Sequence, residues 1–260
     1  MNISFIGAGN LATHLATALM NAGHSIVSVY SRTMKSASEL ARKLGNVNVA
    51  TDNLECLVPA EIYIISVKDD AVETIVERWP SKCRNGIVVH TAGTLPMTLI
   101  ATTSEQIGVL YPLQTFSKNK PVCFKEIPCF IESNNEATLK VLQALASSIS
   151  QMVIELSSEE RKHLHVAAVF ACNFVNHMVA LGYELMERHG IPPSTLLPLI
   201  DETVTKLSTM HPHDCQTGPA RRGDKQVIDA HLEELKGDEE LRILYEEISK
   251  SIMRRFQQTT

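Results

Sequence analysis

The first twelve residues place the strongest constraint on the fold. Residues 3–6 form an uncharged, β-prone run, and the motif G-x-G-x-x-A follows at once over residues 7–12. Gly7 permits the tight turn out of the strand, and Gly9 lets a pyrophosphate approach the backbone because it has no Cβ. Ala12 is small enough for the next helix to pack closely against the strand. The segment therefore predicts a strand, a phosphate-facing turn and a helix.

The helix after this turn is indicated by apolar residues at helical spacing from Leu11 to Ala22. Its first N–H groups would face an anion, which the helix dipole stabilises by roughly 0.3–1 kcal/mol. We expect Gly7, Gly9, Asn10 and Leu11 to hold a dinucleotide. The alternative is a glycine-rich turn in an α/β domain that binds nothing.

The end of the second predicted strand, Ser25–Tyr30, indicates which dinucleotide binds. NAD enzymes usually carry an Asp or Glu there, about 20 residues after the glycines, but this chain reads Ser31-Arg32-Thr33. A hydroxyl and a guanidinium suit a 2′-phosphate, because both form charge-assisted hydrogen bonds with it. We predict NADP(H) as the cofactor, held by Ser31, Arg32 and Thr33. In the alternative, Arg32 is solvated and Ser31 caps a helix.

Strands and helices alternate along the first half of the chain. The next strands are predicted at 47–50, 61–67 and 87–90, with helices at 34–44 and 70–78. This alternation implies right-handed crossovers in an α/β fold, a mostly parallel Rossmann-type sheet with helices on both faces. Ligands bind beyond the carboxyl ends of such strands. The residues expected there are Ser66, Val67, Thr91 and Gly93 on the cofactor and His90 beside the reacting ring.

His90 is a candidate proton relay, because an imidazole titrates near neutral pH. The alternative is a satisfied histidine that closes a strand. The remaining elements of the first domain, residues 1–156, are strands at 107–110, 127–131 and 151–156 and a helix at about 135–148.

A proline-fixed turn, Tyr111-Pro112-Leu113-Gln114-Thr115-Phe116, follows the strand at 107–110. It carries an aromatic hydroxyl, an amide and a second hydroxyl, and loops at a sheet end often face substrate. We expect Tyr111, Gln114 and Thr115 to contact substrate. The alternative is a loop that only packs Phe116.

Residues 157–260 are predicted to form an all-α domain. Ser157 and Glu160 form a capping box for a long helix that runs to about His189. Its middle is apolar nearly all round, as in a helix that is buried or spans a membrane. The polar residues within it are His165, Asn173, Asn176 and His177.

These four polar residues interrupt the apolar run, which argues against a membrane span. At 100° per residue they share an arc of about 120°. Burying each without a partner costs roughly 1–3 kcal/mol, so each must hydrogen-bond to a helix, water or ligand. We expect His165 and Asn173 to be catalytic and Asn176 to bind substrate. The alternative is polar contact between helices.

The last part of the chain is predicted to hold helices at 194–209, 225–235 and 238–257 around a polar loop at 210–223. Arg222 and Asp224 are expected to reach the substrate, with Asp224 also capping the helix after it. His211 and His213 have no further ligands at a familiar spacing, so we predict no metal site.

Composition excludes several classes of protein. The net charge is −5, which gives no indication of nucleic acid or anionic lipid as a partner. The six cysteines are scattered without C-x-x-C pairs and no signal-peptide pattern is present, so we expect reduced thiols in the cytoplasm.

Several stretches together resemble a family of Rossmann-like NADP oxidoreductases with a helical C-terminal domain of unassigned function. They are residues 7–12, 31–33, 66–70, 90–93, 111–116, 167–174, 217–219 and 222–224. The layout is similar to pyrroline-5-carboxylate reductase, deazaflavin-dependent NADP oxidoreductases and the 3-hydroxyisobutyrate/6-phosphogluconate dehydrogenases. The resemblance implies a helical dimerisation domain and an active site between the domains.

One departure from that family pattern concerns proton transfer. The hydroxyacid dehydrogenases carry Lys-x-x-x-Asn on the first long helix, and if Asn173 matches that Asn, Val169 stands at the Lys position. Val169 cannot move a proton, so a carbonyl reduced by that route fits less easily than an imine. We therefore expect an NADP(H)-dependent oxidoreductase acting on a small carbonyl or imine compound. The alternatives are a non-catalytic NADP sensor and a dimeric scaffold.

Overall fold

The computed structural model describes residues 1–45 and 47–257, and these form two compact units. The first contains Met1–Cys172 and the second begins at Asn173. The boundary was expected after residue 156, but the helix that follows it, α5 (Ser158–Ala168), belongs with the sheet. The reason is a buried arginine on that helix, Arg161, which is described below.

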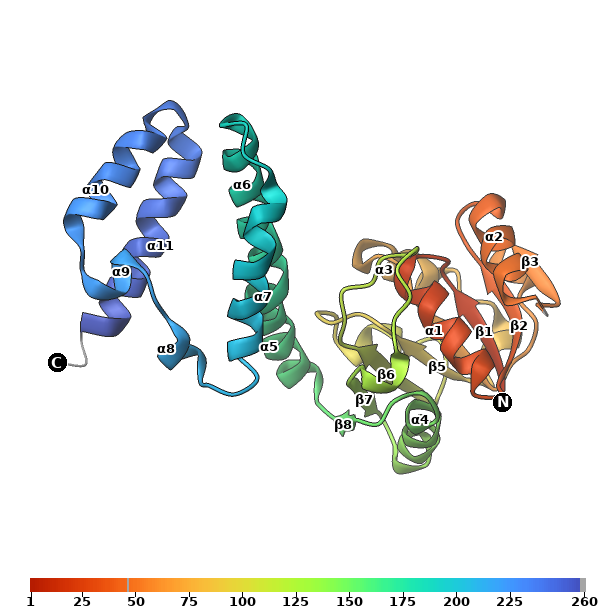
Figure 1. Ribbon diagram of the computed structural model, residues 1–260. Coiled ribbons are helices and arrows are strands. Elements are labelled where there is room, and N and C mark those ends of the chain that lie inside the picture. Colours follow the sequence, from red (N-terminus) through yellow and green to blue (C-terminus); the bar gives the residue numbers. More distant parts are fainter. Residues whose placement is uncertain (46, 258–260) are drawn as a thin grey trace. The chain divides into compact units, whose positions relative to one another are not determined.

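The first unit is built on one eight-stranded sheet in the described part of the chain (Figure 1). The strand order is β3-β2-β1-β4-β5-β6-β7-β8, and all neighbours are parallel except the antiparallel pair β6 and β7. The strands are β1 (Asn2–Ile6), β2 (Ser25–Tyr30), β3 (Val49–Thr51), β4 (Ile62–Ile65), β5 (Ile87–His90), β6 (Ile107–Pro112), β7 (Cys129–Ser133) and β8 (Val153–Glu155). This confirms the predicted Rossmann-type, mostly parallel sheet.

One face of the sheet is covered by three helices. Strand residues at alternate positions, such as Phe5 and Ile64, pack with Leu15 and Leu142 in one buried cluster. The period of two follows from side chains that point to opposite faces along a strand. The helices on this face are α1 (Asn10–Asn21), α2 (Met34–Leu44) and α4 (Glu136–Ile149).

The opposite face holds the other set of alternating residues. Ile6 and Ile65 pack there with Val72 of α3 (Asp69–Glu77), and Tyr111 packs with Leu164 of α5 (Ser158–Ala168). Short 3₁₀ turns complete the unit: η1 (Leu54–Cys56), η2 (Ser81–Cys83), η3 (Met97–Ile100) and η4 (Phe124–Glu126). Helix α5 therefore belongs to the core of the sheet domain. Both faces of the sheet are covered by helices.

The long helix is not a single α-helix. Residues Val169–Phe174 form a π-helix, η5, between α5 and α6 (Val175–Arg188). A π-helix bonds residue i to i+5, so it adds about one residue to a turn and shifts the phase of everything after it. The 120° arc expected for His165, Asn173, Asn176 and His177 assumed 100° at every residue, so the π-helix changes the angle between His165 and the three residues that follow it. The predicted capping box of Ser157 and Glu160 is confirmed.

The second unit is entirely helical over its described residues. Its elements are α6, η6 (Pro193–Leu196), α7 (Leu197–Lys206), α8 (Pro212–Cys215), α9 (Pro219–Arg222), α10 (Lys225–Glu234), η7 (Leu235–Gly237) and α11 (Glu239–Gln257). The segment predicted as a polar loop at 210–223 contains the short helices α8 and α9. Both start at a proline, whose fixed φ suits the first turn of a helix.

The helical run Ser158–Arg188 is exposed over its most apolar window. By length and composition it resembles a membrane-crossing helix, a test that core helices of soluble proteins also pass. Its first turns are fixed to the sheet domain by Arg161, which is 1% exposed.

His90 is fully buried at the end of β5 and does not reach solvent. The Ala92 N–H donates to its Nδ1 at 3.2 Å, which leaves the ring proton on Nε2. Burial, together with the charge of Arg161, lowers the pKa of His90 to about 4. The nearby Pro96 carbonyl raises the pKa slightly and so offsets part of this shift, although it forms no hydrogen bond with His90 Nε2. Such a ring is neutral at pH 7 and is enclosed, unlike the expected proton relay.

We predict that His90 makes the fold acid-sensitive between about pH 6.5 and 4. In the unfolded chain the imidazole of His90 takes up a proton near pH 6.5, whereas in the folded protein it does so only near pH 4. The free energy of unfolding therefore falls as the pH drops through this window. The loss is at most roughly 3 kcal/mol by pH 4. Urea unfolding across this pH range should show a shallower decline for His90→Gln than for the wild type. The exposed His163→Gln variant is the matched control, and equal slopes in all three proteins would contradict the assignment.

Candidate functional site

The turn after β1 has the shape needed to hold a pyrophosphate. Gly7 has φ +123°, and a Cβ there would lie 2.0 Å from the Ser66 carbonyl oxygen. Gly9 is exposed, and a Cβ built on it meets nothing within 4 Å, so the space in front of it is open. Gly7 is thus required by the fold, whereas Gly9 leaves room for a ligand.

The N-terminus of α1 is free to bind an anion. Gly9 occupies the N-cap position, no side chain caps the helix, and no acidic residue lies in its first turn. Its first N–H groups and the positive end of the helix dipole therefore face the open side of the turn. Leu11 is half-buried there, and the exposed Asn10 uses its side chain to bond the Phe116 carbonyl at 2.9 Å. Only the backbone of Asn10 is left for a phosphate.

The end of β2 presents the residues predicted to read a 2′-phosphate. Arg32 is exposed, and Ser31 is half-buried with its N–H bonded to the Thr51 carbonyl. Thr33 caps α2 by accepting the Ser36 N–H, so the capping residue is Thr33 and not Ser31. The guanidinium of Arg32 is the one group of this trio that combines charge with exposure.

The carboxyl ends of β4 and β5 lie side by side, as the parallel pairing requires. Ile65 is opposite His90, and the Thr91 N–H bonds the Ile65 carbonyl at 3.1 Å. Ser66 and Thr91 are buried and Val67 is half-buried. These three residues form the wall next to the Gly7 turn, because the Ser66 N–H bonds the Ile6 carbonyl.

Tyr111 and His165 form the main polar pair beyond the sheet. The Tyr111 hydroxyl lies 3.0 Å from His165 Nδ1. A Cβ on Gly93 would lie 2.6 Å from His165 Nδ1 and 3.1 Å from Tyr111 Cζ, so the glycine is what allows the pair to approach the loop after β5. Burial raises the pKa of Tyr111, opposed by Arg161, so its hydroxyl keeps its proton at neutral pH. The pair brings together Gly93, Tyr111 and His165, all predicted from the sequence.

Arg161 and Glu132 hold this arrangement, and sequence reasoning missed both. Arg161 bonds the carboxylate of Glu132, the carbonyl of Ala92 at 3.2 Å and the carbonyl of Leu95 at 2.6 Å. Ser158 donates to Glu132 and accepts the Met97 N–H at 2.9 Å. A charged residue four positions after the helix cap resembles any solvated first-turn residue, so no pattern in the chain marked it.

The predicted substrate loop is fastened to the start of α1. His14 Nε2 lies 3.0 Å from the Ser117 carbonyl, its ring stacks on Phe116, and Asn10 bonds the preceding carbonyl. Gln114 and Thr115 are exposed and bond each other, with the Thr115 N–H donating to Gln114 Oε1 at 2.8 Å. The loop thus packs Phe116, as the alternative held, while its Tyr111 end belongs to the polar pair.

The other predicted site residues lie in the second unit. Asn173 and Asn176 are exposed, and so is Arg222 at the end of α9. Asp224 caps α10 by accepting the Val227 N–H at 3.3 Å, which confirms the predicted cap. Within the described residues no three of His, Cys, Asp and Glu converge as a metal site would require.

Two known families match the chain, and the second match runs across the boundary between the two structural units. The family described as "NADP oxidoreductase coenzyme F420-dependent" matches residues 2–93, and "Domain of unknown function (DUF2520)" matches residues 127–252. The first match covers the pyrophosphate turn and ends at Gly93. The second covers the last strands of the sheet and most of the helical unit.

A crystal structure from Bacteroides fragilis, described as a "putative NADP oxidoreductase", is 46% identical and covers 97% of this chain and 98% of that one, with a TM-score of 0.89. The 1-pyrroline-5-carboxylate reductase of Streptococcus pyogenes is 15% identical, covers 98% of each chain and has a TM-score of 0.66, a likeness of fold alone.

A Caenorhabditis elegans protein named "Putative pyrroline-5-carboxylate reductase 4" is 34% identical over 101 residues. That match takes in 37% of this chain and 33% of the relative, so the similarity spans about a third of the relative's length. The Bacteroides fragilis structure, in contrast, is matched along nearly its whole length. The chain therefore belongs to the same family of NADP oxidoreductases as the Bacteroides fragilis protein.

Proposed function

We propose that the protein transfers a hydride between NADP(H) and a small carbonyl or imine compound. The observation that carries this proposal is the Tyr111–His165 pair beside Gly93, at the same edge of the sheet as the open turn at Gly9. Relatives named as NADP oxidoreductases and pyrroline-5-carboxylate reductases support it.

The residues present fit a dinucleotide. The uncapped start of α1 and the open space at Gly9 suit the pyrophosphate, with backbone donors from residues 9–11. The exposed Arg32 suits a 2′-phosphate, and no carboxylate stands at residues 31–33 to repel it. Ser66, Val67, Thr91 and Gly93, at the ends of β4 and β5, would contact the part of the dinucleotide between the pyrophosphate and the nicotinamide.

The bound nicotinamide supplies the hydride, and the protein must supply or remove a proton. Tyr111 keeps its phenolic proton at neutral pH and can donate it to the nitrogen or oxygen of a reduced substrate. His165 contacts the same hydroxyl at 3.0 Å and is only half-buried, so it can replace that proton from solvent. Val169 at the expected lysine position then presents no obstacle, because the phenol takes over the proton transfer.

A sensor that binds NADP without turnover is the second candidate, favoured by the missing lysine. Oxidation of NADPH against a panel of cyclic imines and 2-oxo acids, alongside NADPH affinity, separates the two. Binding without turnover across the panel supports the sensor, and absence of binding supports a scaffold.

Arg32 should decide between the two nicotinamide cofactors. We predict that Arg32→Ala weakens NADPH binding by roughly 1.5–3 kcal/mol, the range for a charged hydrogen bond, and leaves NADH binding nearly unchanged. Titration calorimetry with both cofactors measures the difference, and Lys35→Ala, a nearby exposed cation, is the matched control. Equal losses for NADPH and NADH would show that Arg32 does not read the phosphate.

The polar pair should control turnover. We predict that Tyr111→Phe and His165→Gln each lower kcat by about 10²-fold or more, the usual contribution of a general acid, with NADPH affinity within a few-fold. Tyr245→Phe is the matched control, because Tyr245 forms a similar pair with His231 at 2.7 Å in the helical unit. Asn173→Ala, measured in the same assay, shows whether the helical unit contributes to turnover. Wild-type rates for both pair variants would place the proton donor elsewhere.

We also propose that the protein is a homodimer through its helical unit. Apolar side chains are exposed there, including Val175 at 48%, Leu199 at 65% and Val204 at 58%. An apolar groove of about 350 Å³ adds to this surface, lined by Met178, Leu181, Leu244 and Ile248 among others. A second copy of the chain presents a matching apolar surface, and an obligate interface of this kind buries roughly 2,000 Å² or more.

Sedimentation equilibrium should give the mass of a dimer at micromolar concentration. Leu199→Glu should shift the protein towards monomer, because the interface would have to desolvate a carboxylate. Glu202→Gln, on the same helix and already exposed, should remain dimeric. A monomeric wild-type protein would rule out this assembly.

The six free thiols are compatible with a reducing compartment such as the cytoplasm.

A further inference from the structure

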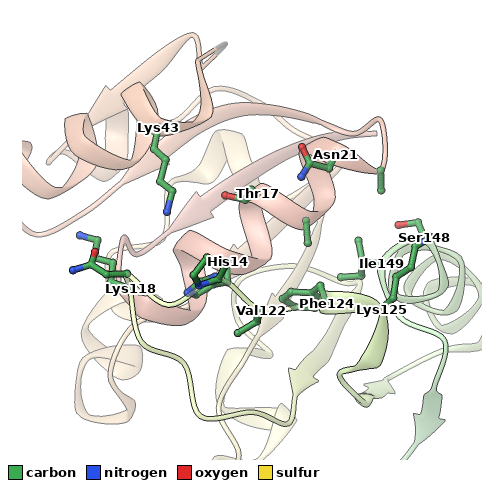
Figure 2. A pocket seen from close by; sticks show the side chains of 14 residues that line it. His14, Thr17, Asn21, Lys43, Lys118, Val122, Phe124, Lys125, Ser148 and Ile149 are labelled. Carbon is green, nitrogen blue, oxygen red and sulfur yellow. The ribbon is translucent and has the colours of Figure 1, made fainter.

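A pocket of about 660 Å³ lies on the sheet face opposite the Tyr111–His165 pair. Its floor is one face of α1, with residues at positions i, i+3, i+4, i+7 and i+8 from His14 to Ala22. The end of α4 and the segment 118–125 close its sides (Figure 2). The volume falls within the range of small-molecule sites, and none of the dinucleotide residues lines it.

The pocket combines an apolar floor with cationic edges. Ala18, Val122 and Phe124 supply the apolar surface, and Lys43, Lys118 and Lys125 supply the charge. Lys43 and Lys118 lie at one end, whereas Lys125 lies at the other with Ser148 (Figure 2). The lining residues, all within the described chain, include no carboxylate.

The two ends of the pocket differ in electrostatic potential. Asn21 ends α1 and Ile149 ends α4, so the Lys125 end receives the negative ends of two helix dipoles. Lys125 offsets that potential. The other end receives one such dipole, that of α2, where Lys43 is the next-to-last residue, but it sets two ammonium groups, those of Lys43 and Lys118, against it. Glu39 lies 3.7 Å from the Lys118 ammonium and competes with an anion for it. An anionic group is therefore favoured between Lys43 and Lys118.

We propose that this pocket binds a small organic anion whose apolar ring system packs on α1 and Phe124 and whose phosphate or carboxylate lies between Lys43 and Lys118. The site is separate from the dinucleotide turn, because it lies along the later turns of α1 and on the far face of the sheet from His165. Its ligand therefore binds whether or not the cofactor is present.

The test is calorimetric titration of the full chain with 1-naphthyl phosphate in excess NADP⁺, which occupies the dinucleotide turn. We expect one probe molecule per chain. Lys43→Gln and Lys118→Gln should each weaken binding by about ten-fold, since each removes a charged partner of the phosphate. Glu39→Gln should strengthen it, because Lys118 loses a competing carboxylate. Lys120→Gln, on the same segment but outside the pocket, is the matched control and should bind within two-fold of the wild type.

Two further arms complete the design. Ala22→Trp places a large ring in the pocket from an exposed position and should abolish binding without disturbing the core. 1-Naphthoate carries a carboxylate in place of the phosphate, and 1-naphthalenemethanol carries a neutral hydroxymethyl group. Whichever of 1-naphthyl phosphate and 1-naphthoate binds more tightly identifies the preferred head group. The proposal is overturned if NADP⁺ displaces the probe, if the neutral probe binds as tightly as both anions, if the lysine variants bind normally, or if no binding occurs. None of these outcomes bears on hydride transfer, which the turnover assay tests separately.

Discussion

The ion pair between Arg161 and Glu132 is the interaction on which the edge of the sheet around Tyr111 and His165 depends. Arg161 is 1% exposed, and its guanidinium satisfies two carbonyls of the loop after β5 as well as the carboxylate. A charge so buried is stable only when its hydrogen bonds are all made, and removal of one partner typically costs 3–5 kcal/mol. The loop, β7 and α5 are thereby held in one geometry, and Gly93 and His165 are placed by it.

The same cation explains two perturbed groups nearby. It adds to the burial that keeps His90 neutral and opposes the burial that raises the pKa of Tyr111. One buried positive charge therefore helps to keep His90 unprotonated and limits the rise in the pKa of Tyr111. The two rings differ in their surroundings, because the Tyr111 hydroxyl contacts the half-buried His165, whereas His90 is fully buried.

Local patterns predicted most of the fold, because local physics determines most of it. The uncharged run before Gly7, the alternation of strand residues and the capping box at Ser157 each act over a few residues, and each appeared where expected. The π-helix at 169–174 did not, since an i+5 bond leaves no signature in a pattern that assumes 3.6 residues per turn. The angles predicted for Asn173, Asn176 and His177 relative to His165 shift with it.

The candidate site was predictable only in part for a related reason. Gly93, Tyr111 and His165 could be named individually because each follows a strand or interrupts an apolar helix. That Tyr111 and His165 would meet, 54 positions apart, depends on how α5 packs across β6. Arg161 was missed because its importance comes from burial, which a solvated-looking position near a helix start does not reveal.

The crowding at Gly93 has a consequence for what the site tolerates. The Tyr111 and His165 rings lie within contact distance of a bare peptide, with less room than a single methyl group would need. In the proposed reaction, a substrate would approach the phenol from the side away from the loop, because the loop backbone occupies the other side. The close contact at Gly93 would then determine which face of the substrate receives the proton.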